Sequence, residues 1–457
     1  MMYELGCVLL LAGLPAFGSP DNDGMRDELD QLRALVQQQQ TQLQTQDQRL
    51  ASQDQQIAQM RRQAEGQWLT AHRADEIKSL VREVLGDAET RASLMDSAIT
   101  AGHDGSNFFL AGEDGNFLLK IKGQLQARYT YSRQEKPGAA MSGDTSGDEN
   151  RGSFGITRSR FGFAGHVIDP TWQYTFWAGY DCSGAAVILD AYITKVLDAH
   201  WSVTAGQFKL PFMYEYLVSE TSLQFIERSL VAGEFCGTYT QGVMATYQGD
   251  MFRGRVSFND GASAINTTWS KRDTEVALTG RGEIKVMGDW KDYTDWEGWR
   301  SQNPLLVFGG AAHWQIGEYG TTDTGEIESL RWTVDGSLEQ PGWNLFAAVT
   351  GQHDSRGRSA DEIAVVVQGG VFVTDETELI ARYEWGDPDT ADNDDLSLLS
   401  TGVNYFFHRH QLKYSLDVGY AFSGIGSIFE SSALGWRQDA AGADGQVVVR
   451  TQVQMLF

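Results

Sequence analysis

Lysine and arginine residues recur at alternate positions in several segments of this 457-residue chain. Side chains two positions apart on a β-strand point to the same face, so each pair would place positive charge on one side of a sheet. Fixed cations of this kind attract anions and repel cations without making or breaking a bond. The candidates are Lys120, Lys122, Arg128, Arg158, Arg160, Arg253, Arg255, Arg281, Lys285 and Arg450, with Arg331, Arg382 and Lys413 in the same pattern.

Acidic residues on the same faces are fewer, and they leave an alternative open for any single base. A lysine or arginine can pair with a neighbouring carboxylate, or extend its charge to a strand end, instead of facing a solute. The acidic candidates for such pairing are Glu275, Glu283, Glu378, Glu384 and Asp417.

Other chemistries find little support in the sequence. The histidines stand in no recognisable motif with Ser or Asp, so no catalytic residue and no enzyme is predicted. No Cys/His spacing suggests a zinc site, and we expect neither metal nor cofactor. The net charge of −25 argues against nucleic acid as a partner. Cys182 and Cys236 could form one disulfide or remain thiols.

The elements that would hold these bases are strands. The last thirteen residues, GQVVVRTQVQMLF, alternate apolar and polar residues up to Phe457. A strand that ends the chain has no later strand to pair with, so it must pair far back in the sequence, as in a closed barrel. The edge of a soluble β-sandwich would show the same alternation. The segment that begins at Asn116 alternates in the same way and is the natural partner.

The composition separates these alternatives. About sixteen alternating segments follow one another from residue 116 to 457, and short turns between them interleave with longer Gly/Asp/Ser-rich loops. The mean hydropathy is −0.34, and no run of 18 apolar residues occurs beyond the N-terminal end, which excludes a helical membrane protein. Aromatic residues tend toward strand ends. We therefore predict an all-β, 16-stranded antiparallel transmembrane β-barrel over residues 113–457.

The N-terminal part has a different pattern. Residues 1–19 are predicted to be a signal peptide, with an apolar core that includes Cys7. Hydrophobic residues spaced by seven predict a helical coiled coil over residues 25–65, and a Gln-rich disordered linker is the alternative. Residues 66–112 are expected to form a helical segment and linker.

One loop interrupts the barrel pattern. Alternation stops over about residues 210–237, where the chain is too apolar for a loop in water, so we expect it to fold into the barrel and narrow it. A lid over the mouth is the alternative. The predicted constriction residues are Lys209, Phe212, Glu215, Glu220, Glu227 and Arg228. Residues 288–304, rich in Trp and Asp, break the short-turn pattern without an evident reason.

Several motifs carry a resemblance to a known family. They are RSRFGFAGHVIDPTWQYTF from Arg158, LDAYI from Leu189, AGQFKLPF from Ala205, LQFIERS from Leu223 and QGVMATYQGD from Gln241. This block resembles the phosphate-selective porin O and P family. The resemblance implies a sixteen-stranded trimeric outer-membrane porin with a loop folded into its lumen. Phosphate-specific members carry a basic cluster on that loop, whereas this loop carries four glutamates, which favours a general or weakly anion-preferring porin.

The function expected from sequence is therefore passive diffusion of small hydrophilic solutes, including anions such as phosphate, through a water-filled channel. The expected partners are outer-membrane lipid, two further copies of the chain, the solutes, and peptidoglycan through the coiled coil. The expected location is the outer membrane of a Gram-negative-type envelope, with the coiled coil in the periplasm. The alternative is an envelope tether, in which the barrel is an anchor and the coiled coil binds the cell wall.

Overall fold

The computed structural model describes residues 79, 99–136, 149–180, 185–269, 273–318, 327–355, 361–389, 395–440 and 442–457. The chain divides into two units, Met1–Asp96 and Ser97–Phe457. The predicted signal peptide and coiled coil, as well as Cys182, lie outside the described residues. In the described part of the chain, no helix is long and apolar enough to cross a membrane.

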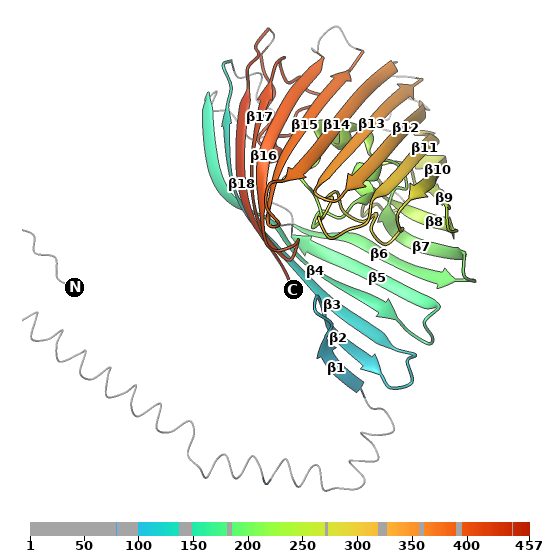
Figure 1. Ribbon diagram of the computed structural model, residues 1–457. Helices are drawn as coiled ribbons and strands as arrows, with labels where there is room; N and C mark the ends of the chain where they lie inside the picture. Colours follow the sequence, from blue (N-terminus) through green and yellow to red (C-terminus); the bar gives the residue numbers. More distant parts are fainter. Residues whose placement is uncertain are drawn as a thin grey trace, which may run out of the picture. The chain divides into compact units, whose positions relative to one another are not determined.

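Sixteen antiparallel strands close into a ring, as the sequence predicted (Figure 1). Each strand pairs with its neighbours in sequence, and the last strand pairs with the first. The strands are β3 (Leu118–Arg133), β4 (Asn150–His166), β5 (Trp172–Tyr180), β6 (Ala186–Val196), β7 (Trp201–Lys209), β8 (Tyr239–Gln248), β9 (Phe252–Asn259), β10 (Asp273–Met287), β11 (Leu305–Glu318), β12 (Ile327–Gln340), β13 (Trp343–Asp354), β14 (Asp361–Phe372), β15 (Thr377–Asp387), β16 (Leu396–His408), β17 (Leu412–Ala421) and β18 (Val447–Leu456).

The closure depends on the C-terminal residue. Gly123 and Phe457 exchange backbone hydrogen bonds, with the Gly123 N–H donating at 2.5 Å and the Phe457 N–H at 3.1 Å. The aromatic ring of Phe457 lies over Gly123, where a Cβ atom would come within 2.3 Å of it. Glycine at this position leaves room for the ring, and a larger residue would have to displace it.

Residues 99–112, expected from sequence to be linker, form a β-hairpin. Its strands β1 (Ile99–His103) and β2 (Phe108–Gly112) pair with each other, and β2 continues onto the N-terminal end of β3. The local reason is the apolar run from Phe108 to Leu110, which pairs with Leu119 and Ile121 of β3.

The barrel wall has its polar face inward. On β18, Arg450 is 1% exposed while Val453 is 47% exposed, and the same alternation runs through β12 to β17. Large apolar side chains thus cover the outside, and Arg, Glu, Gln and Asn side chains fill the inside. Such a wall is unstable in water and suited to hydrocarbon, in which every backbone group must be paired within the barrel.

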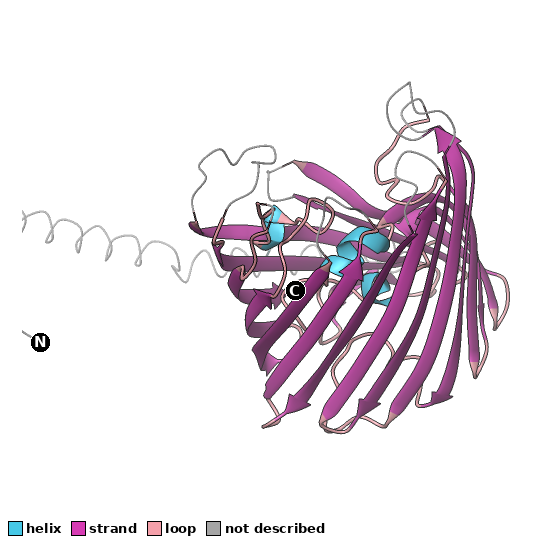
Figure 2. Ribbon diagram, turned by 90° about the horizontal axis from the view of Figure 1, so that it is seen from above, coloured by secondary structure: helices cyan, strands magenta, loops and turns pink. Residues whose placement is uncertain are grey.

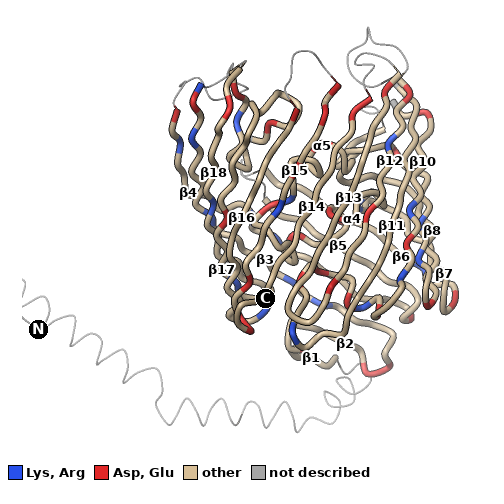
Figure 3. The backbone as a smooth tube through the Cα atoms, turned by 45° about the horizontal axis from the view of Figure 1, so that its top comes forward, with Lys and Arg blue, Asp and Glu red and all other residues tan. Residues whose placement is uncertain are grey.

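The two ends of the barrel differ. At one end the connections are short, such as residues 341–342 and 409–411, apart from residues 288–304. At the other end they are long, such as residues 210–238 and 422–446, and acidic residues gather at several strand ends there (Figure 3). The helices α4 (Tyr214–Leu217) and α5 (Leu230–Phe235) belong to the segment 210–238 and lie inside the ring of strands (Figure 2).

Candidate functional site

The candidate site is the lumen, and the segment 210–238 (the inward loop) is its main occupant. Phe212, Val231 and Phe235 are fully buried, and α5 packs against β13, β14 and β15 on the inner wall. Ser229 begins α5 by accepting a hydrogen bond from the Ala232 N–H, as a helix N-cap does. The apolar composition of this loop therefore reflects packing inside the barrel.

The loop is held to the wall through its backbone. Lys413 donates to the Leu223 carbonyl at 2.5 Å, Arg382 to the Glu227 carbonyl at 2.9 Å and Arg281 to the Phe212 carbonyl at 2.8 Å. These bases come from β17, β15 and β10, so these anchors lie on the β10–β18 side of the barrel. Charge-assisted bonds to carbonyls remove the cost of burying loop backbone. Their first role is thus to fix the loop, a role that the sequence analysis did not foresee for these bases.

Glu220 is the centre of the first charged cluster. Its carboxylate lies 3.3 Å from Arg160, 3.2 Å from Arg228 and 3.9 Å from Lys209. Burial alone would raise the pKa of Glu220, but the positive charges of Lys209, Arg228 and Arg160 hold it well below its usual range. Asp190 on the same cavity lining is a second carboxylate near these bases, so three bases face two carboxylates and the cluster keeps a positive excess.

Glu227 is the centre of the second cluster. Arg128 contacts it at 2.5 Å, and Arg158 bonds both of its oxygens at 2.9 and 2.7 Å. Burial would raise the pKa of Glu227, but Arg158 and Arg128 lower it strongly. A further loop acid, Glu215, has a different role: it is 1% exposed and accepts hydrogen bonds from the Ser229 N–H and hydroxyl. Glu215, Glu220 and Glu227 therefore all have partners within the barrel and do not present free negative charge to the lumen.

A third basic group lies on β9 and β10. Arg253 and Arg281 both contact Glu283, and Arg281 also binds Asp335 at 2.7 and 2.8 Å. Arg255 pairs across the strands with Arg281, and its guanidinium lies within electrostatic range of Glu283. Three arginines thus face two carboxylates on this wall.

A cavity of about 220 Å³ lies between the inward loop and the wall from β3 to β8. Its lining combines Arg160, Asp190, Tyr192, Lys209, Glu220 and Tyr239. On the opposite side, from β10 to β18, the inward side chains are buried by the loop and by residues 422–446. The described cavity therefore lies on the β3–β8 side of the lumen, beside the Glu220 cluster.

The structure brings some predicted residues together and separates others. Arg158, Arg160, Lys209 and Glu220 meet as described, whereas Lys120 bonds Asp104 of the β1–β2 hairpin at 2.8 Å. Lys122 is half-buried on the same strand. Arg450 is fully buried against Asp417, and Lys285 lies over the Trp290 ring. Predicted from the same alternation, these bases have different roles because the loop covers some of them.

Sequence reasoning missed a second segment that enters the barrel. Residues 288–304 (the turn-side plug) bury Tyr293, Trp296 and Trp299. The Tyr293 ring stacks on Tyr214 of the inward loop with centroids 4.1 Å apart and planes 1° apart. Trp296 packs edge-on against Phe346 at 4.5 Å. Its Trp-rich composition was the signal, because tryptophans concentrated in a connection need a surface to bury them.

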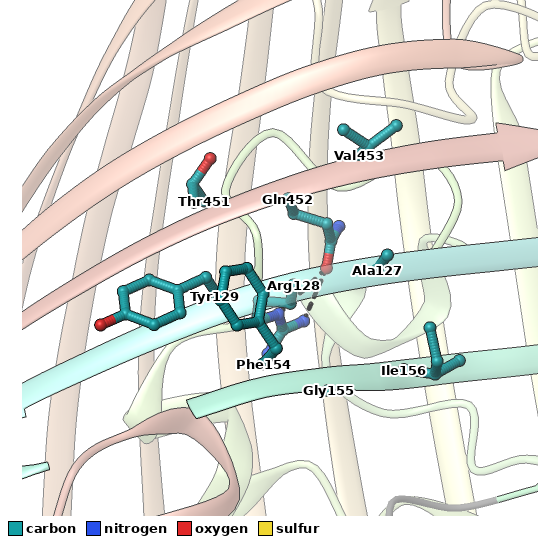
Figure 4. Close-up of a pocket in the computed structure, with 9 residues that line it drawn as sticks. All are labelled: Ala127, Arg128, Tyr129, Phe154, Gly155, Ile156, Thr451, Gln452 and Val453. Atoms are coloured by element: carbon teal, nitrogen blue, oxygen red, sulfur yellow. Dashed lines mark hydrogen bonds between the residues drawn. The ribbon is translucent and has the colours of Figure 1, made fainter. Parts of the chain in front are cut away.

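An apolar pocket lies on the outer face of the barrel. It has a volume of about 540 Å³ beside the irregularity where β3 and β4 change register at Gln126 and Ala127 (Figure 4). Outward side chains of β3, β4 and β18 line it, among them Tyr129, Ile156 and Val453. The Arg128 guanidinium bonds Gln452 across the same strands. This pocket belongs to the barrel's outer surface, although Arg128, which contacts Glu227, contributes to its lining.

Residues 124–294 match the family described as phosphate-selective porin O and P. No curated protein is significantly similar to the chain. Among solved structures, the anion-selective porin from Comamonas acidovorans matches at a TM-score of 0.51 and 12% identity, over 74% of this chain and 99% of that chain. The DcaP channel of Acinetobacter baumannii matches at 0.50 and 13%, over 74% and 97%. A loop-deletion mutant of OmpT from Vibrio cholerae matches at 0.50 and 13%, over 74% and 99%.

Proposed function

We propose that the chain is an outer-membrane porin, because it forms a sixteen-stranded barrel and matches the phosphate-selective porin O and P family over residues 124–294, and that its lumen favours small anions without strict specificity for phosphate. The observation that carries this proposal is the Glu220 cluster, in which one carboxylate faces Arg160, Lys209 and Arg228 beside the open cavity. A positive excess at the narrow part of a water-filled pore attracts anions.

The acidic total charge does not oppose this. Much of it lies at loop ends, and charges exposed to solvent are screened within about 8 Å at physiological ionic strength. The lumen charges lie on the permeation path and are screened less. In the sequence, the four loop glutamates argued against strict specificity for phosphate. They do not argue against a general preference for anions, because Glu220 and Glu227 pair with bases and Glu215 binds the loop at Ser229.

We further propose that the short-turn end faces the periplasm, as in other barrels of this class. A trimer with a periplasmic coiled coil over residues 25–65 remains a proposal that rests on the heptad spacing, since a lone helix cannot bury that seam. Deleting residues 25–65 tests the tether alternative, because a tether would lose its attachment to the cell wall while a porin would still conduct.

The decisive experiment for anion preference is the reversal potential of the purified protein in a planar bilayer across a salt gradient. Arg160→Gln should lower the anion-to-cation permeability ratio about threefold, by the Coulomb estimate for one lost charge beside the path. Lys136→Gln, an exposed charge at the loop end, is the control and should leave the ratio unchanged. Cation preference in the wild-type protein would overturn the proposal, and the absence of conductance steps from folded protein would favour the tether.

A further inference from the structure

A histidine and two carboxylates meet at the short-turn end of the barrel. Asp295 and Glu297 belong to the turn-side plug, and His410 lies in the turn between β16 and β17. The His410 Nε2 atom is 3.2 Å from Asp295 Oδ2 and 3.1 Å from Glu297 Oε2. One ligand-type atom from each residue lies within 4.8 Å of the others.

These distances suit a metal ion. A tetrahedral ion with nitrogen and oxygen ligands at about 2.1 Å sets its ligand atoms about 3.4 Å apart. The two measured contacts to His410 are close to that spacing, so an ion would need only a small outward shift of the three side chains. Residues on two separate turns converge here, which local chain geometry does not require.

The groups are buried and incompletely partnered. Glu297 is fully buried, and its Oε1 atom makes no hydrogen bond among the described residues; the same holds for His410 Nδ1. The surroundings are apolar, since Trp299 packs against Phe406 at 4.8 Å and against the His410 ring at 5.7 Å. Unpartnered polar atoms in such a setting cost free energy unless a ligand satisfies them.

The nearest further base is already engaged elsewhere. Lys413 lies within electrostatic range of Glu297 but donates to the Leu223 carbonyl of the inward loop. It therefore does not satisfy the Glu297 Oε1 atom.

We propose that Asp295, Glu297 and His410 form a binding site for a divalent transition-metal ion of the Zn²⁺ type. Imidazole nitrogen selects such ions over Ca²⁺ and Mg²⁺, which prefer oxygen ligands. The Trp299 indole N–H donates to Asp295 Oδ2 at 3.2 Å and orients that ligand. The ion would join the turn-side plug to the β16–β17 turn and so fix the plug inside the barrel.

The test uses the full-length protein without a histidine tag, stripped with chelator and then titrated with Zn²⁺. We expect about one tightly bound Zn²⁺ per chain, and a rise in the thermal unfolding midpoint of roughly 5 °C at a hundredfold excess over the dissociation constant. Glu297→Gln and His410→Ala should abolish this zinc-dependent rise. His353→Ala is the matched control, because His353 pairs with a single exposed carboxylate, Asp361, at 2.7 Å.

Three outcomes would overturn the proposal. In the first, Zn²⁺ does not bind stoichiometrically and does not change the unfolding midpoint, and His410→Ala destabilises the protein equally with and without Zn²⁺. The three residues would then form a simple ion pair between an imidazolium and carboxylates. Equal stabilisation by Ca²⁺, retained in His410→Ala, would exclude the histidine as a ligand. If the variants do not fold, Co²⁺ added to the wild-type protein supplies a second readout: visible absorption displaced by Zn²⁺ supports the site, and its absence overturns it.

Discussion

Glu220→Gln is the substitution that tests the charge of the lumen most directly. It removes one negative charge and keeps the size and shape of the side chain. Glu220 lines the cavity and faces Arg160, Lys209 and Arg228 at 3.3, 3.9 and 3.2 Å. Its backbone carbonyl still accepts a hydrogen bond from Gln126, so the inward loop keeps that anchor. We expect the anion preference to increase.

The magnitude follows from Coulomb's law. An ion passing about 6 Å from the site in water gains or loses about 0.7 kcal/mol per unit charge. Screening over that distance at physiological ionic strength reduces the figure to about 0.3 kcal/mol. A monovalent anion gains what a cation loses, so the permeability ratio should rise about threefold. A lower effective permittivity beside the protein wall makes this a minimum.

Reversal potentials under a salt gradient measure this ratio, with Glu376→Gln as the control. Glu376 is an exposed residue of the turn between β14 and β15, so the same charge change occurs away from the cavity. The assignment of the permeation path would be refuted if Glu220→Gln lowered the anion-to-cation permeability ratio. It would also be refuted if the ratio stayed unchanged in Glu220→Gln while the control behaved as wild type. The loss of a buried ionic partner should also lower stability by on the order of 3 kcal/mol, seen as a lower unfolding midpoint.

Two further predictions concern the lumen. Trp296→Ala should lower stability by about 3–5 kcal/mol and increase the single-channel conductance, because it removes a fully buried ring that joins the turn-side plug to the inward loop. The control is Trp332→Ala, which removes an outward-facing ring and should leave the conductance unchanged. An unchanged conductance in Trp296→Ala would place the plug away from the path. Burial raises the pKa of the Cys236 thiol to about 11. At pH 8, maleimide should therefore label Cys236 in the folded Cys7→Ser/Cys182→Ser protein at least a hundredfold more slowly than in the unfolded protein, and the rate should rise as the pH approaches 11. Rapid labelling of the folded barrel at pH 8 would contradict the buried position of α5.

The strand pattern could be predicted from sequence because burial in this barrel repeats every two residues. A lipid-facing side chain and a lumen-facing side chain alternate along each strand, and turn residues mark the ends. The pairing of the final strand with the first also followed, since a terminal strand with one apolar face needs a distant partner. The hairpin of β1 and β2 did not follow, because its strands are short and its pairing with β3 lies beyond the closed ring.

The arrangement of side chains within the lumen could not be predicted from sequence to the same extent. Alternation predicts that a base faces inward, but it gives the same prediction for Arg160, which lies beside the cavity, and for Arg450, which is fully buried against Asp417. The difference arises from which wall the inward loop and the turn-side plug cover. That is a tertiary contact between residues more than sixty positions apart, such as Tyr214 and Tyr293, and no local periodicity encodes it.

The two inward segments also suggest how an acidic chain could present the proposed basic path. The turn-side plug brings acidic residues into the β10–β17 side of the barrel, where Glu297 is fully buried at its end. The inward loop places Glu220 and Glu227 against five bases, counting Arg128, Arg158, Arg160, Lys209 and Arg228. Negative charge is thus concentrated where the lumen is filled, or is outnumbered by bases where it is open. In the proposed pore, the sign of the selectivity would therefore be set by which charges the two segments cover, and the net charge of −25 carries little information about it.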